Sequence, residues 1–138
     1  MTAVGTGIKD DPWQLRTPPG TAEYSMYRDD AADPARLVCV VGSTTLYYDA
    51  RCIEDLTAML RGADDWIPLG SADENKPARD GTVEAWGRSP ANPLGAWYGL
   101  RKGFRGRFGM YLPPLLEALG LAELEHGPRN NRMRSRSD

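Results

Sequence analysis

The stretch at residues 37–48, LVCVVGSTTLYY, decides the fold class of this chain. Two runs of aliphatic, β-branched and aromatic residues, 37–41 and 44–48, flank the dipeptide Gly42-Ser43. A two-residue connection with glycine first is typical of a type II′ turn, whose twist matches that of the strands it joins. The sequence therefore predicts an antiparallel hairpin here.

A helix is expected directly after this hairpin. Asp49 is placed to accept hydrogen bonds from the first free backbone amides of such a helix. Ile53, Leu56 and Leu60 recur at helical spacing and form one apolar stripe, and Gly62 supplies a stop signal. The sequence thus predicts a hairpin followed by a helix as the central unit of the fold.

Two further short strands are predicted on either side of this unit. Residues 22–28 alternate well enough to form a strand with Tyr24 and Met26 on one face. Residues 65–69 suggest another strand, which Pro68 pushes toward a sheet edge because proline cannot donate a ladder hydrogen bond. Both strands fit a small antiparallel sheet.

The second half of the chain contains three short helix candidates and a terminal hairpin. The helices are expected at residues 82–87, at 93–100 with Asn92 as cap and Pro93 in first position, and at 113–119 closed by Gly120. Residues 122–126 and 132–136 flank the turn-forming sequence GPRNN and predict a C-terminal β-hairpin.

Length and composition favour one α+β domain over residues 1–138. Hydrophobic residues make up 41% and charged residues 26%, and the 15 glycines and 11 prolines favour short elements over a helical bundle. We divide the chain into a flexible arm at 1–9, an acidic hairpin–helix half at 10–80 and a basic aromatic half at 81–138. Residues 1–80 carry net charge −6 and residues 81–138 carry +4, so the folded molecule is expected to be electrically polar.

Several classes of chemistry have no support in the sequence. His126 is the only histidine, and Cys39 and Cys52 lie too far apart for a zinc pattern, so we predict no metal site and no catalytic triad. Phosphate-loop, dinucleotide-binding and nucleophile-elbow motifs are missing, so no cofactor is expected. No apolar run reaches membrane-spanning length and no secretory leader is visible, which favours the cytoplasm and no membrane partner.

Residues 88–111 are the most unusual segment, because cations and aromatic rings interleave there without a carboxylate. The cations are Arg88, Arg101, Lys102, Arg105 and Arg107, and the rings are Trp97, Tyr98, Phe104, Phe108 and Tyr111. Guanidinium groups neutralise phosphates while rings stack on unpaired bases, which indicates nucleic-acid binding. Alternatively, the rings fill the core and the cations form its solvated rim.

The C-terminal segment adds a second basic feature. Arg129, Arg132, Arg134 and Arg136 lie on or after the predicted turn, an order resembling the wing of a winged helix-turn-helix. The preceding helix at 113–119 offers no arginine, lysine, asparagine or glutamine for a DNA groove, which indicates a buried helix. The arginines either bind phosphates or form a soluble basic tail that pairs with acidic residues.

Three functional hypotheses follow. The first is a non-enzymatic binding module that contacts nucleic acid through Arg101, Lys102, Arg105, Arg107, Arg132 and Arg134, with Trp97 or Phe104 stacking on bases. The second is a protein-interaction or homodimerisation domain whose interface contains Trp86, Trp97, Tyr98 and Tyr111. The third is an enzyme with an unfamiliar site built on Glu84 or Asp73 with Arg88 and Tyr98.

Four short motifs are distributed along the chain: Asp11-Pro12-Trp13, Thr17-Pro18-Pro19-Gly20, Gly106-Arg107-Phe108-Gly109-Met110-Tyr111 and Asn130-Asn131-Arg132-Met133-Arg134. With these motifs the chain resembles a family of small uncharacterised bacterial proteins, mostly actinobacterial. The resemblance covers nearly everything from Gly5 to Arg134. It implies a bacterial cytosolic protein of unknown function and transfers no catalytic residue.

Overall fold

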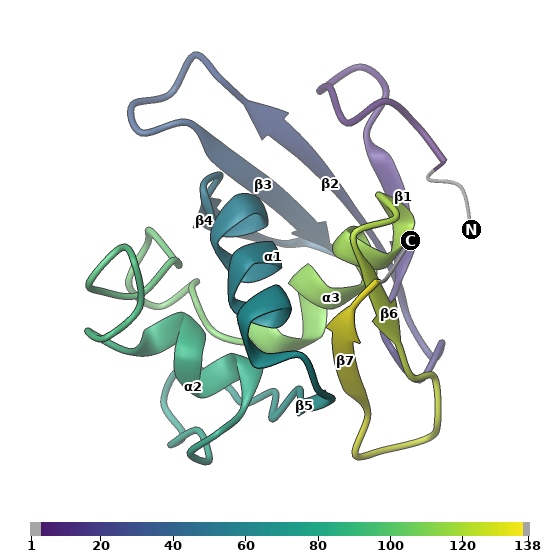
Figure 1. Cartoon of the computed structure of the whole chain (residues 1–138). Coiled ribbons are helices and arrows are strands. Elements are labelled where there is room, and N and C mark those ends of the chain that lie inside the picture. Colours follow the sequence, from purple (N-terminus) through teal and green to yellow (C-terminus); the bar gives the residue numbers. More distant parts are fainter. Residues whose placement is uncertain (1–3, 137–138) are drawn as a thin grey trace.

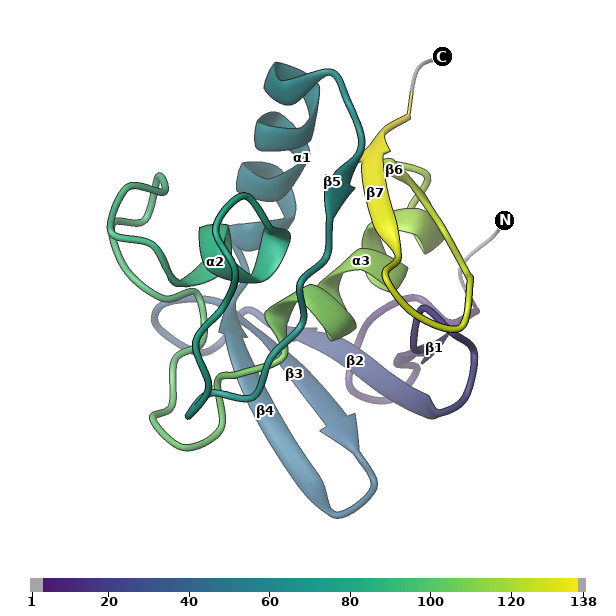
Figure 2. The same ribbon diagram turned by 90° about the horizontal axis from the view of Figure 1, so that it is seen from below.

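The computed structural model describes residues 4–136 and places helix α3 between two antiparallel sheets (Figures 1 and 2). The first sheet has the order β1 (Trp13–Arg16), β2 (Glu23–Asp29), β3 (Arg36–Val41), β4 (Thr44–Asp49). The second has the order β5 (Ile67–Pro68), β7 (Arg132–Ser135), β6 (Ala122–Leu124). The helices are α1 (Cys52–Ala63), α2 (Val83–Arg88) and α3 (Phe108–Ala118). The predicted α+β class is confirmed.

The predicted central hairpin is present as β3 and β4. Leu37 pairs with Tyr48 and Val41 with Thr44, and Gly42 has a φ of 58°, as the first position of a type II′ turn requires. Tyr24 and Met26 on β2 are both buried, so the predicted face of that strand is also correct. The alternation of residues 22–28 therefore identified the face of β2 that lies against the core.

Helix α1 follows the hairpin, but its ends differ from the prediction. The Asp49 carboxylate accepts a hydrogen bond from the backbone N–H of Arg51, which precedes the helix, at 3.1 Å. Gly62 lies inside the helix, which instead ends at Asp64 in the left-handed conformation with φ 51°. An aspartate tolerates that conformation better than most residues, so it replaces glycine as the terminating residue.

Helix α3 is longer than predicted. Its two prolines indicate the beginning of a helix, but the helix starts before them because its residues are buried between the two sheets. We expected it at residues 113–119, yet it begins at Phe108, five residues earlier, and holds Pro113 and Pro114 in its interior. Glu117 is its one charged residue, and a helix that is apolar on all sides must be buried. Packing between the two sheets offsets the backbone hydrogen bonds that the prolines remove.

The helix predicted at residues 93–100 does not form. The Asn92 side chain closes a turn instead, accepting from the Gly95 N–H and donating to the carbonyls of Trp86 and Ala96. The chain beyond this turn pairs with the free edge of β4, where Leu100 N–H donates to the Tyr47 carbonyl at 2.8 Å. Tertiary pairing thus takes the backbone groups that a helix would have used.

The structure places residues 4–9 of the predicted flexible arm against the first sheet, and residues 1–3 lie outside the described residues. Val4 forms an isolated bridge with Gln14, and the Gly7 carbonyl accepts a hydrogen bond from Arg28 N–H at 2.8 Å. A Cβ on Gly7 would lie 2.2 Å from the Trp13 ring. The segment is therefore packed against the first sheet through a close approach that only glycine permits.

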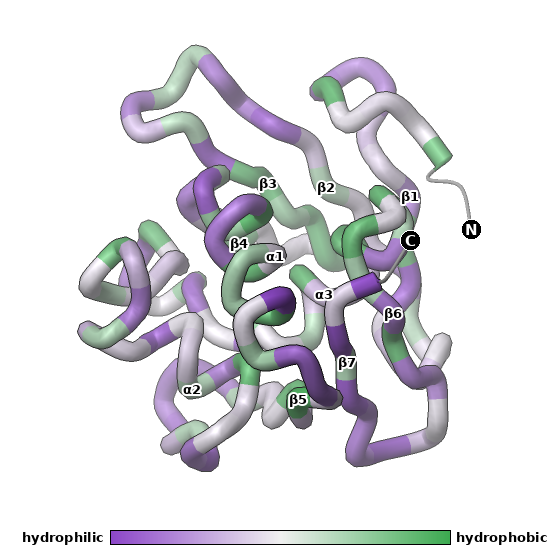
Figure 3. The backbone as a smooth tube through the Cα atoms, viewed as in Figure 1, coloured by the Kyte–Doolittle hydropathy of each residue, from purple (hydrophilic) through white to green (hydrophobic). Residues whose placement is uncertain are grey.

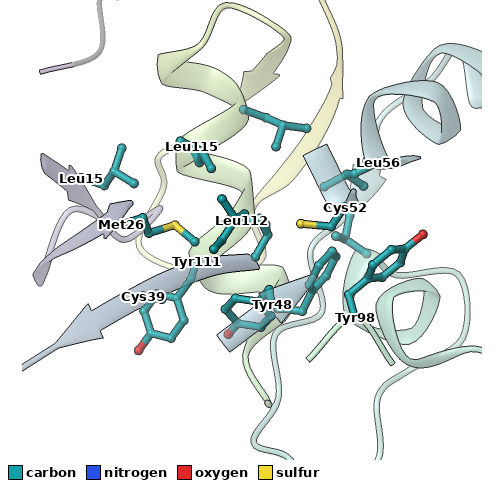
Figure 4. Packing of buried hydrophobic residues seen from close by; sticks show 14 of the residues in the cluster. Leu15, Met26, Cys39, Tyr48, Cys52, Leu56, Tyr98, Tyr111, Leu112 and Leu115 are labelled. Atoms are coloured by element: carbon teal, nitrogen blue, oxygen red, sulfur yellow. The ribbon is translucent and has the colours of Figure 1, made fainter. Parts of the chain in front are cut away.

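Both predicted halves contribute to a continuous hydrophobic core (Figure 4). Its fully buried members include Met26 and Tyr48 from the first half and Tyr98, Phe108 and Leu112 from the second. Figure 3 shows hydrophobic residues along β3, while the β6–β7 turn is hydrophilic. The predicted C-terminal hairpin exists as β6 and β7, and β5, with Pro68, forms an edge as expected.

Candidate anion-binding cleft

The residues predicted to contact nucleic acid lie in two separate places. Arg132 and Arg134 are on β7, and the others belong to the connection between α2 and α3. Figures 1 and 2 show that connection and β7 on different sides of the molecule. The fold therefore does not bring the predicted set together into one surface. The residues of the α2–α3 connection are Trp97, Arg101, Lys102, Phe104, Arg105 and Arg107.

Four of the six predicted cations are paired with carboxylates. Arg105 lies 3.4 Å from Glu74, Arg107 lies 2.6 Å from Asp73 and Arg132 lies 2.8 Å from Glu125. Arg134 pairs with Glu123. The acidic half thus neutralises Arg105 and Arg107, whereas the two arginines of β7 are neutralised by their neighbours on and after β6. Arg101 and Lys102 have no carboxylate partner among residues 4–136.

The aromatic residues of this segment divide between the core and the surface. Tyr98, Phe108 and Tyr111 are buried, so the core alternative is correct for these three rings and they form no exposed dimer interface. Trp97 is half-buried, with the guanidinium carbons of Arg88 and Arg105 4.6 and 4.1 Å from its ring centroid. Phe104 is 38% exposed.

The residues proposed for an unfamiliar catalytic site serve the architecture. The buried Glu84 carboxylate accepts from Gly109 N–H at 2.9 Å, from Ala72 N–H at 3.3 Å and from Arg88 at 3.0 Å. The Tyr98 hydroxyl donates to Asp55 at 2.8 Å. Burial, followed by that hydrogen bond, raises the pKa of Tyr98. Glu84 and Arg88 are paired with each other, Tyr98 donates to Asp55, and Asp73 is paired with Arg107, so all four side chains already have partners within the fold.

A cleft of about 700 Å³ lies between two walls. The first wall is Pro18-Pro19, in the turn between β1 and β2, and the second is the β6–β7 turn at residues 128–131. Its floor includes Leu69 after β5 and Met110 at the beginning of α3. Tertiary packing of the two sheets around α3 therefore brings distant turns to one cavity.

The cleft is rich in cationic and polar donors. Arg79 and Arg129 line it, are exposed, and have no ion-pair or hydrogen-bond partner for their guanidinium groups within residues 4–136. Ser71 and Asn130 also line it, and within the same range their side chains have no hydrogen-bond partner. No carboxylate lines the cleft among these residues. Guanidinium groups that face no carboxylate in the cleft favour an anion there.

Arg132 contributes a third guanidinium at the edge of the cleft. Two of its nitrogens donate to Glu125, at 2.9 and 2.8 Å, and its guanidinium carbon lies 5.2 Å from the Trp66 ring centroid. These contacts fix the orientation of Arg132 and leave Arg79 and Arg129 as the unneutralised charges of the cleft.

The sequence analysis did not group the residues that line this cleft. Arg129 was counted with the basic tail, and Arg79 was not singled out, because it lies in the acidic half. A signal was present in the segments that carry the family resemblance. Thr17-Pro18-Pro19-Gly20, Gly109-Met110 and Asn130-Asn131-Arg132 each contribute residues to the cleft lining, although they are far apart along the chain.

Comparison with known proteins assigns the chain to a family but assigns no activity to it. No curated protein and no solved structure matches the chain. Within residues 4–136 there is no helix with the length and hydrophobicity that a bilayer crossing requires, and no group of three or more His, Cys, Asp or Glu arranged for a metal ion. The sequence model of a family of unknown function, DUF6855, matches residues 5–136, so the chain belongs to this family.

Proposed function

We propose that this protein is a non-catalytic binding module whose cleft takes an anionic ligand. The observation that carries the proposal is that Arg79 and Arg129 line a cavity in which, within residues 4–136, neither has a carboxylate partner and no carboxylate is present. Guanidinium groups match phosphate and carboxylate oxygens with paired N–H donors. The two buried cysteines, which form no disulfide, and the resemblance to bacterial proteins support a bacterial cytoplasmic setting.

The uncharged residues that line the cleft indicate what kind of anion it binds. Pro18, Pro19, Leu69 and Met110 give the cleft an aliphatic surface, and no aromatic ring from the described part of the chain lines it. A base-stacking platform is therefore lacking, and the cleft suits an anionic group carried on an aliphatic body. Its volume is in the range of small-molecule sites.

Replacing either free arginine should weaken anion binding. We expect Arg79→Gln and Arg129→Gln each to raise the Kd for glycerol phosphate about tenfold, since each removes charge-assisted hydrogen bonds. The measurement is a titration followed by backbone amide NMR shifts of residues 68–72 and 128–132. Arg61→Gln is the matched control, because Arg61 is exposed on α1, lacks an ion-pair partner in the described chain and lies outside the cleft. Equal affinities for all variants, or no shift at these amides, would refute the proposal.

Nucleic-acid binding at the α2–α3 connection is a second candidate function. It is favoured by Phe104, which is 38% exposed with the Arg101 guanidinium carbon 4.8 Å from its ring centroid. Arg101 and Lys102 have no carboxylate partner among residues 4–136, so they are available to phosphates. A stacked base between such cations is typical of single-strand binding.

The double variant Arg101→Gln/Lys102→Gln tests this second candidate. If both cations contact phosphates of a labelled single strand, removing them should reduce the slope of log affinity against log salt by about 1.4. Fluorescence anisotropy over a salt series gives this slope, and Arg61→Gln again provides a surface cation outside the segment. An unchanged slope, or no binding of RNA or DNA at low salt, would exclude this segment as the contact.

A further inference from the structure

His126 connects the two walls of the cleft. His126 is the second residue after β6 and comes immediately before the turn that carries Arg129. Its Nδ1 is 2.8 Å from the Pro18 carbonyl in the opposite wall, and its Nε2 is 2.6 Å from the Glu117 carboxylate on α3. A single side chain therefore holds the Pro18-Pro19 wall, the β6–β7 turn and the central helix together.

These two contacts require a protonated ring. A backbone carbonyl and a carboxylate both accept hydrogen bonds, so both ring nitrogens of His126 must donate. Neutral imidazole carries one N–H and can satisfy only one of these partners. The other nitrogen would then present its lone pair to an oxygen. The connection between the walls is complete only when His126 is an imidazolium.

The charges around His126 support the same state. Glu117 is the ionic partner from α3. Arg16 and Glu23, from β1 and β2, line the cavity beside His126 and are paired with each other at 2.6 Å. Glu125, the preceding residue, is paired with Arg132 of β7. Glu117 is therefore the carboxylate that contacts the imidazolium directly.

We propose that the cleft takes up its anion together with a proton, which is held by His126 between the two walls. The inference rests on the proposed anion-binding function. Protonation fixes the Pro18-Pro19 wall opposite Arg129 and adds a positive charge near the cleft. Deprotonation breaks one of the two contacts and removes that charge. By linkage, the anion in turn raises the proton affinity of His126.

The raised pKa of His126 in the free protein agrees with a protonated ring between the two walls. Burial lowers its pKa, but the hydrogen bonds to Glu117 and to the Pro18 carbonyl raise it more, and the pKa lies above its usual value. The cationic form therefore persists above pH 6.5, the unperturbed value for histidine. The contribution of these contacts to stability is present below the unfolded pKa and is lost as pH rises through the folded one.

Sulfate is the probe for the test, because it stays a dianion across the pH range in which histidine titrates. We expect sulfate to bind the full chain at least about fivefold more tightly at pH 5.5 than at pH 8.5, at constant ionic strength. His126 is the only histidine, so its ring NMR signals report its pKa without ambiguity, and saturating sulfate should raise that pKa.

Three variants separate this inference from the proposed function. His126→Gln, which lacks the imidazolium, should bind sulfate at both pH values with about the affinity that the unchanged protein has at pH 8.5. Glu117→Gln should move the pH dependence of sulfate binding to lower pH. Arg129→Gln should keep the imidazolium of the free protein and abolish the rise caused by sulfate. Sulfate binding with the same pH dependence in His126→Gln would overturn the proton linkage alone. No sulfate-induced shift of cleft amides at either pH would overturn the proposed function and this linkage together.

Discussion

Glu84→Ala is expected to lower the free energy of unfolding by about 3–5 kcal/mol, the cost of breaking a buried ion pair by removing one partner. Glu84 is fully buried, and its partner Arg88 has a side chain that is only 11% exposed. The Glu84 carboxylate also accepts from the backbone N–H groups of Ala72 and Gly109. The substitution therefore leaves one charge and two amides without their acceptor.

The consequence of losing Glu84 should extend to the cleft. Arg88 donates to the carbonyls of Ala72, Asp73 and Lys76, so the Glu84–Arg88 pair holds that loop against α2. Ala72 and Gly109 line the cleft. We therefore expect weaker anion binding in any Glu84 variant that still folds.

Urea denaturation followed by tryptophan fluorescence measures this loss of stability. Glu54→Ala is the control, since Glu54 is an exposed carboxylate in the first turn of α1 and should cost less than about 1 kcal/mol. Equal losses in Glu84→Ala and Glu54→Ala would show that the buried pair contributes nothing specific.

Phe108→Ala is the second large effect, with an expected loss of about 3–5 kcal/mol. Phe108 is 1% exposed, and its ring centroid lies 5.6–6.1 Å from those of Tyr48, Trp86 and Tyr98. A Cβ placed on Gly87 would lie 2.5 Å from the Phe108 ring, so this ring fills its space completely. Truncation leaves a cavity that rigid aromatic neighbours cannot close.

The two phenylalanines of the chain make a matched pair for this experiment. Phe104 lies four residues earlier and is 38% exposed. Phe104→Ala should change stability by no more than about 0.5 kcal/mol, as for other exposed positions. Thermal unfolding followed by circular dichroism compares the two variants. A Phe108→Ala protein as stable as Phe104→Ala would contradict the core assigned here.

Local sequence rules succeeded where backbone chemistry and burial pattern agree. Gly42-Ser43 between two alternating runs specified the hairpin, because turn geometry and strand twist act over a few residues. The helix predicted at residues 82–87 is present as α2 (Val83–Arg88), with Thr82 as its cap, whose hydroxyl accepts from Ala85 N–H at 3.2 Å. The apolar sequence of residues 113–119 also indicated a buried helix, although its prolines concealed that the helix begins at Phe108.

The candidate site was predicted less well, because a charge in a sequence does not show its partner. Arg105 and Arg107 were grouped with Arg101 and Lys102 by position, yet Glu74 and Asp73, some 30 residues away, neutralise the first two. Arg129 appeared to be one more charge of a basic tail.

The sequence alone determined the α+β class, the central hairpin and the helix after it. These depend on turn chemistry and hydrophobic periodicity, which are local. Only the tertiary structure decided which arginines are free, that the turns at Pro18-Pro19 and residues 128–131 face each other, and that His126 joins them. The partners of each ion pair and the two walls of the cleft come from segments that are distant in the chain. Packing around α3 sets the distances between these segments.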